Sequence, residues 1–283
     1  MAYAYTFRDL LMNTKFIVPL AIVIGLLIYA FVYPMTFTIN PGRWYYAPRG
    51  LPPSPKYPFG TTATGQDVFL IVPVALRNTL IISFVAAALG IVIALTLGSV
   101  AALTRNQIVR GIVSTFIDVM CMLPSLPILM VVLYAWRDYL ALPSIGAIMS
   151  TLGWTFTGRA IRGFLESLKN RLFIYTSYLS GLSLGKVILK DVVPYLLRYM
   201  MVSFVSMMVW AIGNEVTISV FGAMKMEEVT IGTTIHWALH YNAIFLGQWW
   251  WIAFPILFLA IFMLSLYTVI MEVDTYLFAR AKI

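Results

Sequence analysis

Six long apolar runs dominate this chain and limit what it can fold into. A transmembrane helix needs about 20 mainly apolar residues to cross the hydrocarbon core of a bilayer, and each run is close to this length. The runs are Phe16–Tyr33, Thr79–Leu103, Ile112–Tyr134, Ser144–Phe164, Tyr195–Val220 and Trp249–Met271. The chain is 61% hydrophobic and 11% charged, whereas soluble domains carry about 25% charged residues. We therefore predict an all-α integral membrane protein with six transmembrane helices and no soluble domain.

The segments between the runs predict two parts. Residues 1–72 hold an N-terminal tail, a first helix retained as an anchor, and a polar extracytoplasmic loop rich in Pro and Gly. Residues 73–283 form a core of five helices, with a loop at 165–194. The stretch 59–77 is predicted to be a turn and a short helix at the membrane interface. Pro124 and Pro127 are expected to interrupt the third helix.

The distribution of Lys and Arg predicts the orientation. With the N-terminus inside, 13 of the 19 basic residues fall on the cytoplasmic side and 6 on the outer side, as the positive-inside rule requires. Both termini are therefore expected in the cytoplasm, and the protein in the cell membrane as a multi-pass protein. The net charge of +8 is explained by basic cytoplasmic loops rather than by nucleic-acid binding.

The loop Phe173–Pro194 has the pattern of two short helices. Gly181 suits a C-terminal cap, and Ser183 can cap the helix that follows. Lys186 and Lys190 lie on one side of that second helix, and Pro194 begins the next membrane span, where a missing N–H is tolerated. A structured, half-apolar element beside a membrane predicts a docking partner.

The glycines of this loop do not form a nucleotide site. A phosphate-binding loop needs four residues between its glycines and a Ser or Thr after its Lys. Here three residues separate Gly181 from Gly185, and Val187 follows Lys186. The chain also lacks a Ser-His-Asp order, paired catalytic carboxylates and a cysteine metal set. We predict that it has no catalytic residues and binds no cofactor or metal of its own.

Asp118 and Glu215 are charges within predicted spans. Charges in a membrane are costly and are functional candidates by default. Each is a candidate either for the translocation path or for a structural pair with a neighbouring helix or subunit, and the structural interpretation is favoured. Arg159 and Arg162 are expected to mark the cytoplasmic end of the fourth span by extending toward the headgroups.

The outer segments contain aromatic and histidine side chains. Trp44, Tyr45 and Tyr46 lie in a polar loop and are candidates for contact with a ligand, although an aromatic belt at the membrane interface also explains them. The belt likewise accounts for the tryptophans at 249–251. His236 and His240 share one helix face, as zinc ligands do, but no third ligand is evident except Glu227 or Glu228, so interfacial packing is the favoured interpretation.

Several motifs in order resemble one family. They are the segment Tyr57–Thr79 with Gly60, Gly65, Asp67 and Arg77; Ile117–Pro127 with Asp118, Pro124 and Ser125; Gly158–Arg171; the loop with Gly181 and Pro194; and Glu215 with Phe221 and Gly222. Together the motifs resemble the inner-membrane permease subunits of ABC importers, specifically the C-type subunit of the dipeptide/oligopeptide group. The chain departs from the family at one motif, since Tyr175, Thr176 and Ser177 stand where the family has Glu-Ala-Ala.

The resemblance implies a type I importer permease fold and a working assembly. Its partners would be a second homologous permease, two ATPase subunits that bind ATP and Mg, and an extracytoplasmic substrate-binding protein. The loop 165–194 would couple ATP hydrolysis to alternating access. The cargo that the resemblance implies is di- and oligopeptides, with oligosaccharides or nickel as the alternatives. The alternatives from other classes are an intramembrane enzyme and a channel. An enzyme would need a convergent nucleophile, acid or metal ligands at bilayer depth, which two histidines in one outer segment do not supply. A channel would not need the ordered helix pair.

Overall fold

In the computed structural model, every regular element of the described residues is a helix. The structure describes residues 12–168, 183, 186 and 193–281. The helices are α2 (Thr14–Leu27), η1 (Ile28–Val32), η2 (Tyr33–Thr36), α3 (Val68–Leu103), α4 (Gln107–Met122), α5 (Ser125–Trp136), α6 (Leu142–Gly153), α7 (Thr155–Leu168), α10 (Val193–Val220), α11 (Ile231–His240) and α12 (Trp250–Ala281). This architecture confirms the predicted all-α class.

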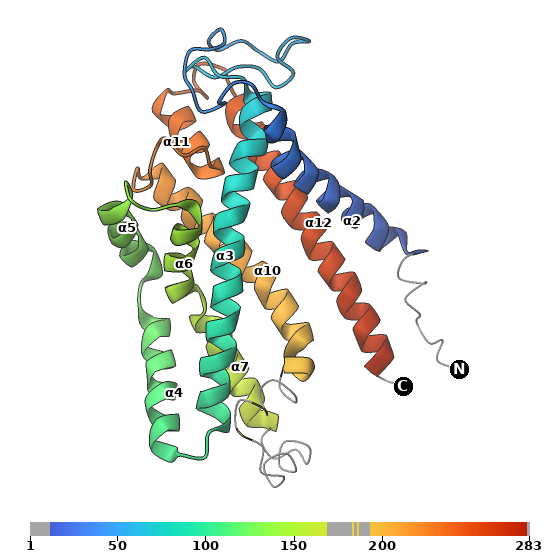
Figure 1. Cartoon of the computed structure of the whole chain (residues 1–283), viewed down its shortest axis with the longest axis vertical. Helices are drawn as coiled ribbons and strands as arrows, with labels where there is room; N and C mark the ends of the chain where they lie inside the picture. Colours follow the sequence, from blue (N-terminus) through green and yellow to red (C-terminus); the bar gives the residue numbers. More distant parts are fainter. Residues whose placement is uncertain (1–11, 169–182, 184–185, 187–192, 282–283) are drawn as a thin grey trace.

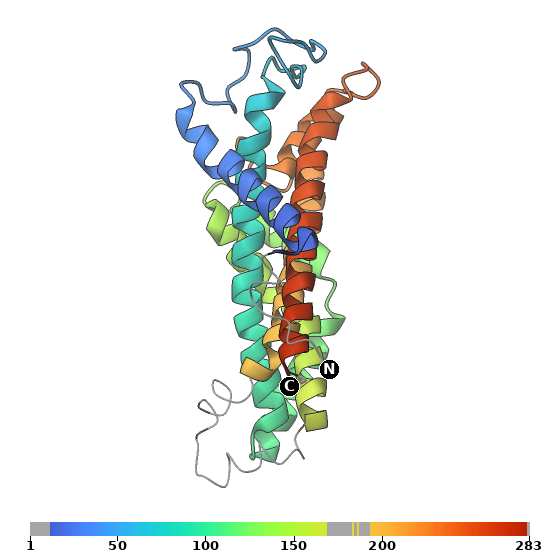
Figure 2. The ribbon, with the colours of Figure 1, turned by 90° about the vertical axis from the view of Figure 1, so that its right-hand side faces the viewer.

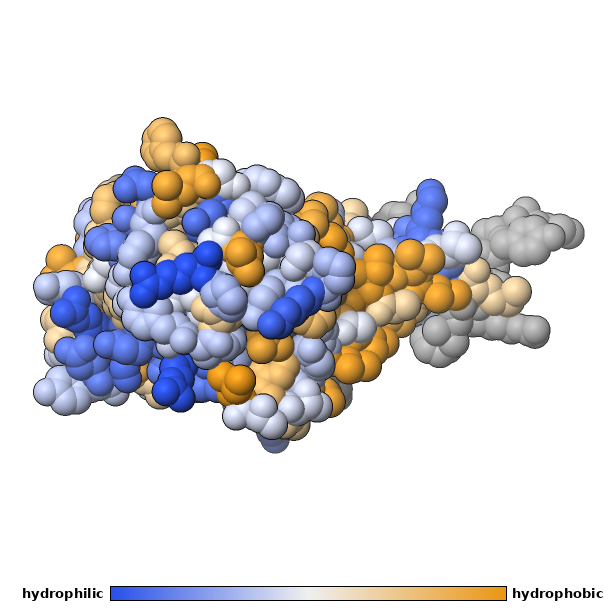
Figure 3. Space-filling model, turned by 90° about the horizontal axis from the view of Figure 1, so that it is seen from above, coloured by the Kyte–Doolittle hydropathy of each residue, from blue (hydrophilic) through white to orange (hydrophobic). Residues whose placement is uncertain are grey.

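The helices form an elongated bundle with irregular segments gathered at one end (Figure 1). We call this end, formed by residues 37–67 and 221–249, the loop end. Figures 1 and 2 show α2 crossing α12 on the outside of the bundle. Seen from above, the loop end shows mainly hydrophilic residues, while the helices extending beyond it expose apolar ones (Figure 3). This distribution suits a bundle set in lipid with one polar end in water.

The long helix α3 forms the centre of the bundle. Its 36 residues span roughly 54 Å at 1.5 Å per residue, well beyond the bilayer core. The separate interfacial helix predicted before residue 79 is wrong, because residues 68–77 are the first turns of α3. Pro73 does not break the helix: the carbonyl of Phe69, which loses its usual N–H partner, accepts a hydrogen bond from the Tyr29 hydroxyl at 3.1 Å. The domain boundary proposed after residue 72 falls inside this helix.

The predicted third and fourth spans are both broken. Helices α4 and α5 meet at an angle of 83° across Leu123 and Pro124, as the prolines predicted. The fourth is divided at Trp154 into α6 and α7, a break that the sequence did not predict. Small residues bring both parts against α3. A Cβ on Gly146 would lie 2.5 Å from the Ile82 carbonyl oxygen, and one on Gly98 would lie 2.7 Å from the Gly158 carbonyl oxygen.

Among the described residues, four helical segments are long and apolar enough to cross a membrane. They are residues 14–36, 68–103, 199–220 and 250–276, and the bent α4–α5 pair makes a fifth if it is counted as one span. The apolar helix α6, with 12 residues, is shorter than a span. The multi-pass membrane character is thus shown, while the six-span count and the cytoplasmic termini stay predictions.

Candidate functional site

Most of the predicted coupling loop lies outside the described residues. Of its predicted residues, Tyr175, Thr176, Ser177, Gly181 and Lys190 fall there, so the proposed contact with an ATPase is untested. Two of its predicted residues, Lys186 and Pro194, lie in the described part of the chain. The side chain of Lys186 is exposed, and Pro194 is the second residue of α10, where a missing N–H costs little.

An ion-pair cluster joins α4 to α7, the helix that precedes the loop. Arg162 donates from Nη1 to Asp118 Oδ2 at 3.1 Å and from Nη2 to Asp118 Oδ1 at 3.0 Å. It also donates to the Ser114 carbonyl at 3.0 Å. Arg159 Nε lies 3.5 Å from the same carboxylate. The two arginines were expected to mark the end of a span, but they hold an acidic partner on the neighbouring helix.

Glu215 is the centre of a buried polar cluster toward the loop end. Its carboxylate accepts from the hydroxyls of Thr230 at 2.5 Å, Ser219 at 3.0 Å and Thr79 at 3.4 Å, and from the backbone N–H of Gly232. The side chain is 1% exposed. The donors come from α3, from α10 itself and from the start of α11. Glu215 therefore ties three helices together, which is a structural arrangement for a buried charge.

The partners of Glu215 were missed in the sequence, although one left a signal. Thr230 and Thr233 form a capping box at the start of α11, and their spacing of three residues is readable from the sequence alone. Thr79 gives no such signal because it is 136 residues from Glu215 along the chain.

The aromatic loop residues have three different environments. Trp44 packs edge-on against Trp237, with ring centroids 5.0 Å apart. Tyr45 is exposed, at a φ of +63°. The hydroxyl of Tyr46 accepts the backbone N–H of Asp67 at 2.9 Å, and burial raises the pKa of Tyr46 to about 12. Of these three residues, only Trp44 lines the cavity described below.

Asp67 caps the first turn of α3. Its carboxylate accepts the backbone N–H of Phe69 at 2.9 Å, as an N-cap residue does. Burial raises the pKa of this carboxyl, and the hydrogen bond from Phe69 works in the opposite direction. The cap fixes the point at which the loop end joins the bundle.

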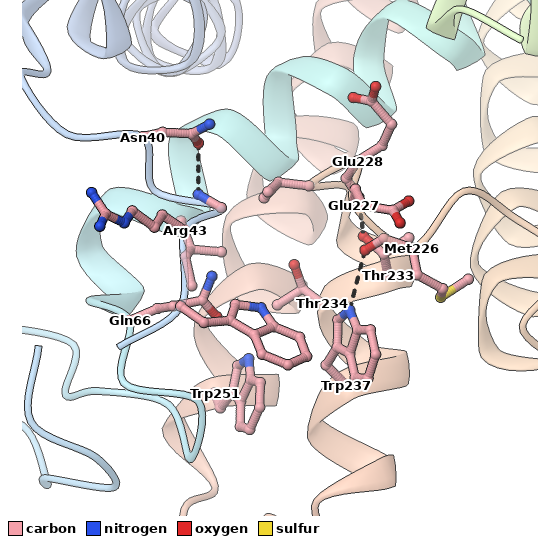
Figure 4. Close-up of a pocket in the computed structure, with 14 residues that line it drawn as sticks. Asn40, Arg43, Gln66, Met226, Glu227, Glu228, Thr233, Thr234, Trp237 and Trp251 are labelled. Atoms are coloured by element: carbon pink, nitrogen blue, oxygen red, sulfur yellow. Dashed lines mark hydrogen bonds between the residues drawn. The ribbon is translucent and has the colours of Figure 1, made fainter. Parts of the chain in front are cut away.

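A cavity of about 550 Å³ opens at the loop end beside Trp44 (Figure 4). Its walls come from the loop at 40–44, the start of α3, the segment 226–229, α11 and α12. The lining residues used below are Arg43, Trp44, Glu227, Glu228, Trp237 and Trp251. The belt interpretation of the tryptophans at 249–251 is wrong for two of them, since Trp250 is 6% exposed and Trp251 is 1% exposed. These two belong to the interior of the protein.

The two histidines stack near this cavity. Their ring centroids are 6.1 Å apart with an angle of 11° between the planes, and His236 Nδ1 lies 3.0 Å from the Val220 carbonyl oxygen. Within the described part of the chain, no three His, Cys, Asp or Glu side chains are grouped to hold a metal ion. The observed contacts are those of packing.

A smaller cavity, of about 160 Å³, lies between the two helix breaks. Leu123 and Ser125 line it from the α4–α5 bend, Gly153 and Thr155 from the α6–α7 break, and Trp210 from α10. The α4–α5 bend and the α6–α7 break therefore border the same cavity. Its lining combines hydroxyl groups with apolar side chains.

Comparison with known proteins identifies the family. The model of the family described as binding-protein-dependent transport system inner membrane component matches residues 94–283. The chain is 26% identical to the dipeptide transport system permease protein DppC of Bacillus subtilis, over 90% of this chain and 79% of that protein. It is 28% identical to the oligopeptide transport system permease protein OppC of the same organism, over 74% and 68%. A third relative is the oligopeptide transport system permease protein AmiD of Streptococcus pneumoniae, 24% identical over 78% and 73%. The chain belongs to the family of inner-membrane components of binding-protein-dependent transport systems.

Proposed function

We propose that this chain is the permease subunit of an ATP-driven importer of dipeptides and oligopeptides. The observation that carries the proposal is that the relatives matched over most of their length are named as dipeptide or oligopeptide permeases. Oligosaccharide or nickel cargo finds no comparable support. The chain forms one half of the path, and a second homologous permease forms the other.

The remaining partners follow from the membership of a binding-protein-dependent system. A substrate-binding protein delivers cargo at the loop end, and two ATPase subunits bind ATP and Mg on the opposite side. This chain hydrolyses nothing itself. The loop 165–194 receives the motion of an ATPase subunit and passes it to α7 and α10, the helices that flank it.

The bundle supports a simple account of alternating access. The α4–α5 bend and the α6–α7 break face one cavity, so reorientation of these short helices changes the shape of the middle of the bundle. The ion pairs between Asp118 and Arg162 make α4 follow α7. The Glu215 cluster fixes α10 to α3 and α11, which keeps the loop end rigid while the opposite end moves. Such stiffness is needed for a distant ATPase to act on the path.

Reconstitution tests the cargo assignment. The four-component assembly in liposomes, supplied with its binding protein, is expected to take up a labelled tripeptide only when ATP is present on the ATPase side. Matched samples with a labelled trisaccharide or with nickel are expected to show no ATP-dependent uptake. Uptake of either of these without uptake of peptide would overturn the peptide assignment.

Cysteine cross-linking tests the coupling assignment. Cys121 is the single cysteine of the chain, so Cys121→Ser gives a clean background. Single cysteines placed from Phe173 to Pro194 are expected to cross-link to an ATPase subunit. A cysteine at exposed Tyr139, on the α5–α6 connection, is the control that should not. Failure at every loop position contradicts the assignment.

A further inference from the structure

One wall of the large cavity includes the indole N–H of Trp251. The indole N–H groups of Trp237 and Trp250 donate to the carbonyls of Met226 at 3.2 Å and Thr61 at 3.0 Å. Trp251 is 1% exposed and lines the cavity, yet within the described residues its indole N–H donates to no acceptor. Figure 4 shows its nitrogen turned toward the interior of the cavity. Trp251 Nε1 is not one of the fully buried side-chain atoms that lack a hydrogen-bond partner in the described residues, so this N–H is reachable from the cavity and is able to donate to water or to a bound ligand.

The rim of the cavity has charges of opposite sign on opposite sides. Arg43 comes from the loop at 40–44, while Glu227 and Glu228 precede α11 (Figure 4). In the described part of the chain, none of the three charged groups has an ion-pair or hydrogen-bond partner. Figure 4 shows the three side chains extending away from the centre of the cavity, and exposed side chains change rotamer within picoseconds to nanoseconds.

The walls between these charges are aromatic. Trp44 and Trp237 meet edge to face, with centroids 5.0 Å apart, and Trp251 stacks beside Tyr241. Large aromatic surfaces with a few polar groups are typical of small-molecule sites, and the volume of about 550 Å³ falls within their usual range of roughly 300–1,000 Å³.

We propose that this cavity is a binding site for a short zwitterionic peptide within the permease itself. Glu227 and Glu228 receive the terminal ammonium, and Arg43 receives the terminal carboxylate. The indole N–H of Trp251 donates to a peptide carbonyl, and Trp44 and Trp237 hold an apolar side chain. The proposal rests on the peptide function above. It adds a binding site at the loop end, where cargo released by the binding protein is held before it enters the bundle.

The test measures binding of the tripeptide Ala-Phe-Ala to the purified full-length chain in lipid nanodiscs by calorimetry. The expected result is saturable binding, weakened about tenfold or more by Glu227→Gln with Glu228→Gln and by Arg43→Gln, since each removes a charge-assisted contact. Asp138→Asn and Arg49→Gln are the controls. Asp138 lies on the α5–α6 connection, and Arg49 stacks on Tyr45 outside the cavity. Both controls are expected to bind as the unaltered chain does.

Blocked peptides make the assignment of each end specific. N-acetylation should weaken binding to the unaltered chain and cause no further loss in the double Gln variant; C-terminal amidation should behave likewise with Arg43→Gln. Trp251→Phe keeps the aromatic wall and loses only the donor, and it should also bind more weakly. No binding of the tripeptide, equal losses in the controls, or binding of maltotriose in its place would each overturn the proposal. Peptide uptake by the full assembly is scored separately. Uptake without binding to this chain rejects the site alone, whereas absent uptake rejects the proposed function.

Discussion

Arg162 on α7 holds the carboxylate of Asp118 on α4 through two hydrogen bonds, at 3.0 and 3.1 Å. Two parallel N–H···O bonds fix both the distance and the relative rotation of the side chains. The Arg162 side chain is 14% exposed and that of Asp118 is 37% exposed. Arg162 lies on α7, the helix that precedes the proposed coupling loop, so the pair ties α4 to that helix.

Loss of the Asp118 charge should destabilise the chain. Asp118→Asn leaves the mostly buried Arg162 without a counter-charge, and we expect the free energy of unfolding to fall by about 1–3 kcal/mol. Arg159→Gln is the matched comparison. Its side chain is 57% exposed and 3.5 Å from the carboxylate, so the expected loss is below about 1 kcal/mol. Denaturant unfolding in detergent measures the free energy of unfolding of both variants. Equal losses would show that the two hydrogen bonds from Arg162 stabilise the chain no more than the longer contact of Arg159 does.

Gly232 should not tolerate a methyl group. A Cβ there would lie 2.6 Å from Glu215 Oε1 and 2.7 Å from Ser219 Oγ, so Gly232→Ala must push apart the buried cluster at a cost of about 1–3 kcal/mol. Gly213 is the control on α10, because nothing lies within 4 Å of its added Cβ. Gly213→Ala is expected to be neutral or slightly stabilising. Thermal unfolding compares the two variants, and a stable Gly232→Ala protein would count against a tightly closed cluster.

The cap at Asp67 should make stability depend on pH. Because burial raises the pKa of this carboxyl, the folded protein retains the proton to higher pH than the unfolded chain does. Stability from this group is greatest below the unfolded pKa and falls as the pH rises through the folded pKa. Asp67→Asn keeps a capping acceptor without the charge, so its unfolding temperature should not fall across that window.

Two substitutions of Asp67, compared at neutral pH, separate the effect of its charge from the effect of its capping hydrogen bond. Asp67→Asn is expected to be at least as stable as the unaltered chain, whereas Asp67→Ala loses the cap and about 1 kcal/mol. Unfolding temperatures of the three proteins, measured from about pH 4 to pH 7 around the usual carboxyl range, check this. Similar destabilisation by Asn and Ala would mean that the ionised form is required.

Substitution of Gly181 is expected to impair the coupling of ATP hydrolysis to peptide uptake and to leave membrane insertion of the chain unchanged. Gly181→Val replaces the residue best suited to a left-handed helix cap with a β-branched one. In the reconstituted assembly we expect ATP hydrolysis to continue without peptide uptake, while the amount of the chain in the membrane is unchanged. Uptake and ATP hydrolysis are measured in the same liposomes. Normal coupled uptake by the variant would reject the role given to this position.

Local patterns were enough to predict much of the fold. Apolar runs long enough for a bilayer identified the all-α membrane class, and Pro124 marked the bend between α4 and α5. Pro73 shows a point where a local pattern is not enough. A proline usually ends a helix because of a lost hydrogen bond, but the Tyr29 hydroxyl, 40 residues away along the chain, donates to the carbonyl that Pro73 leaves open.

The sequence by itself determined the membrane class, the family resemblance and the position of a candidate coupling loop, because hydropathy and motif spacing are local properties of the chain. Only the tertiary structure decided which polar groups meet. Asp118 and Arg162 are 44 residues apart and Thr79 and Glu215 are 136 apart, and no local pattern encodes such pairs. The cavity at the loop end depends on tertiary structure in the same way. Its walls come from five separate segments of the chain, so no single stretch of sequence shows that the Trp251 indole lines a cavity.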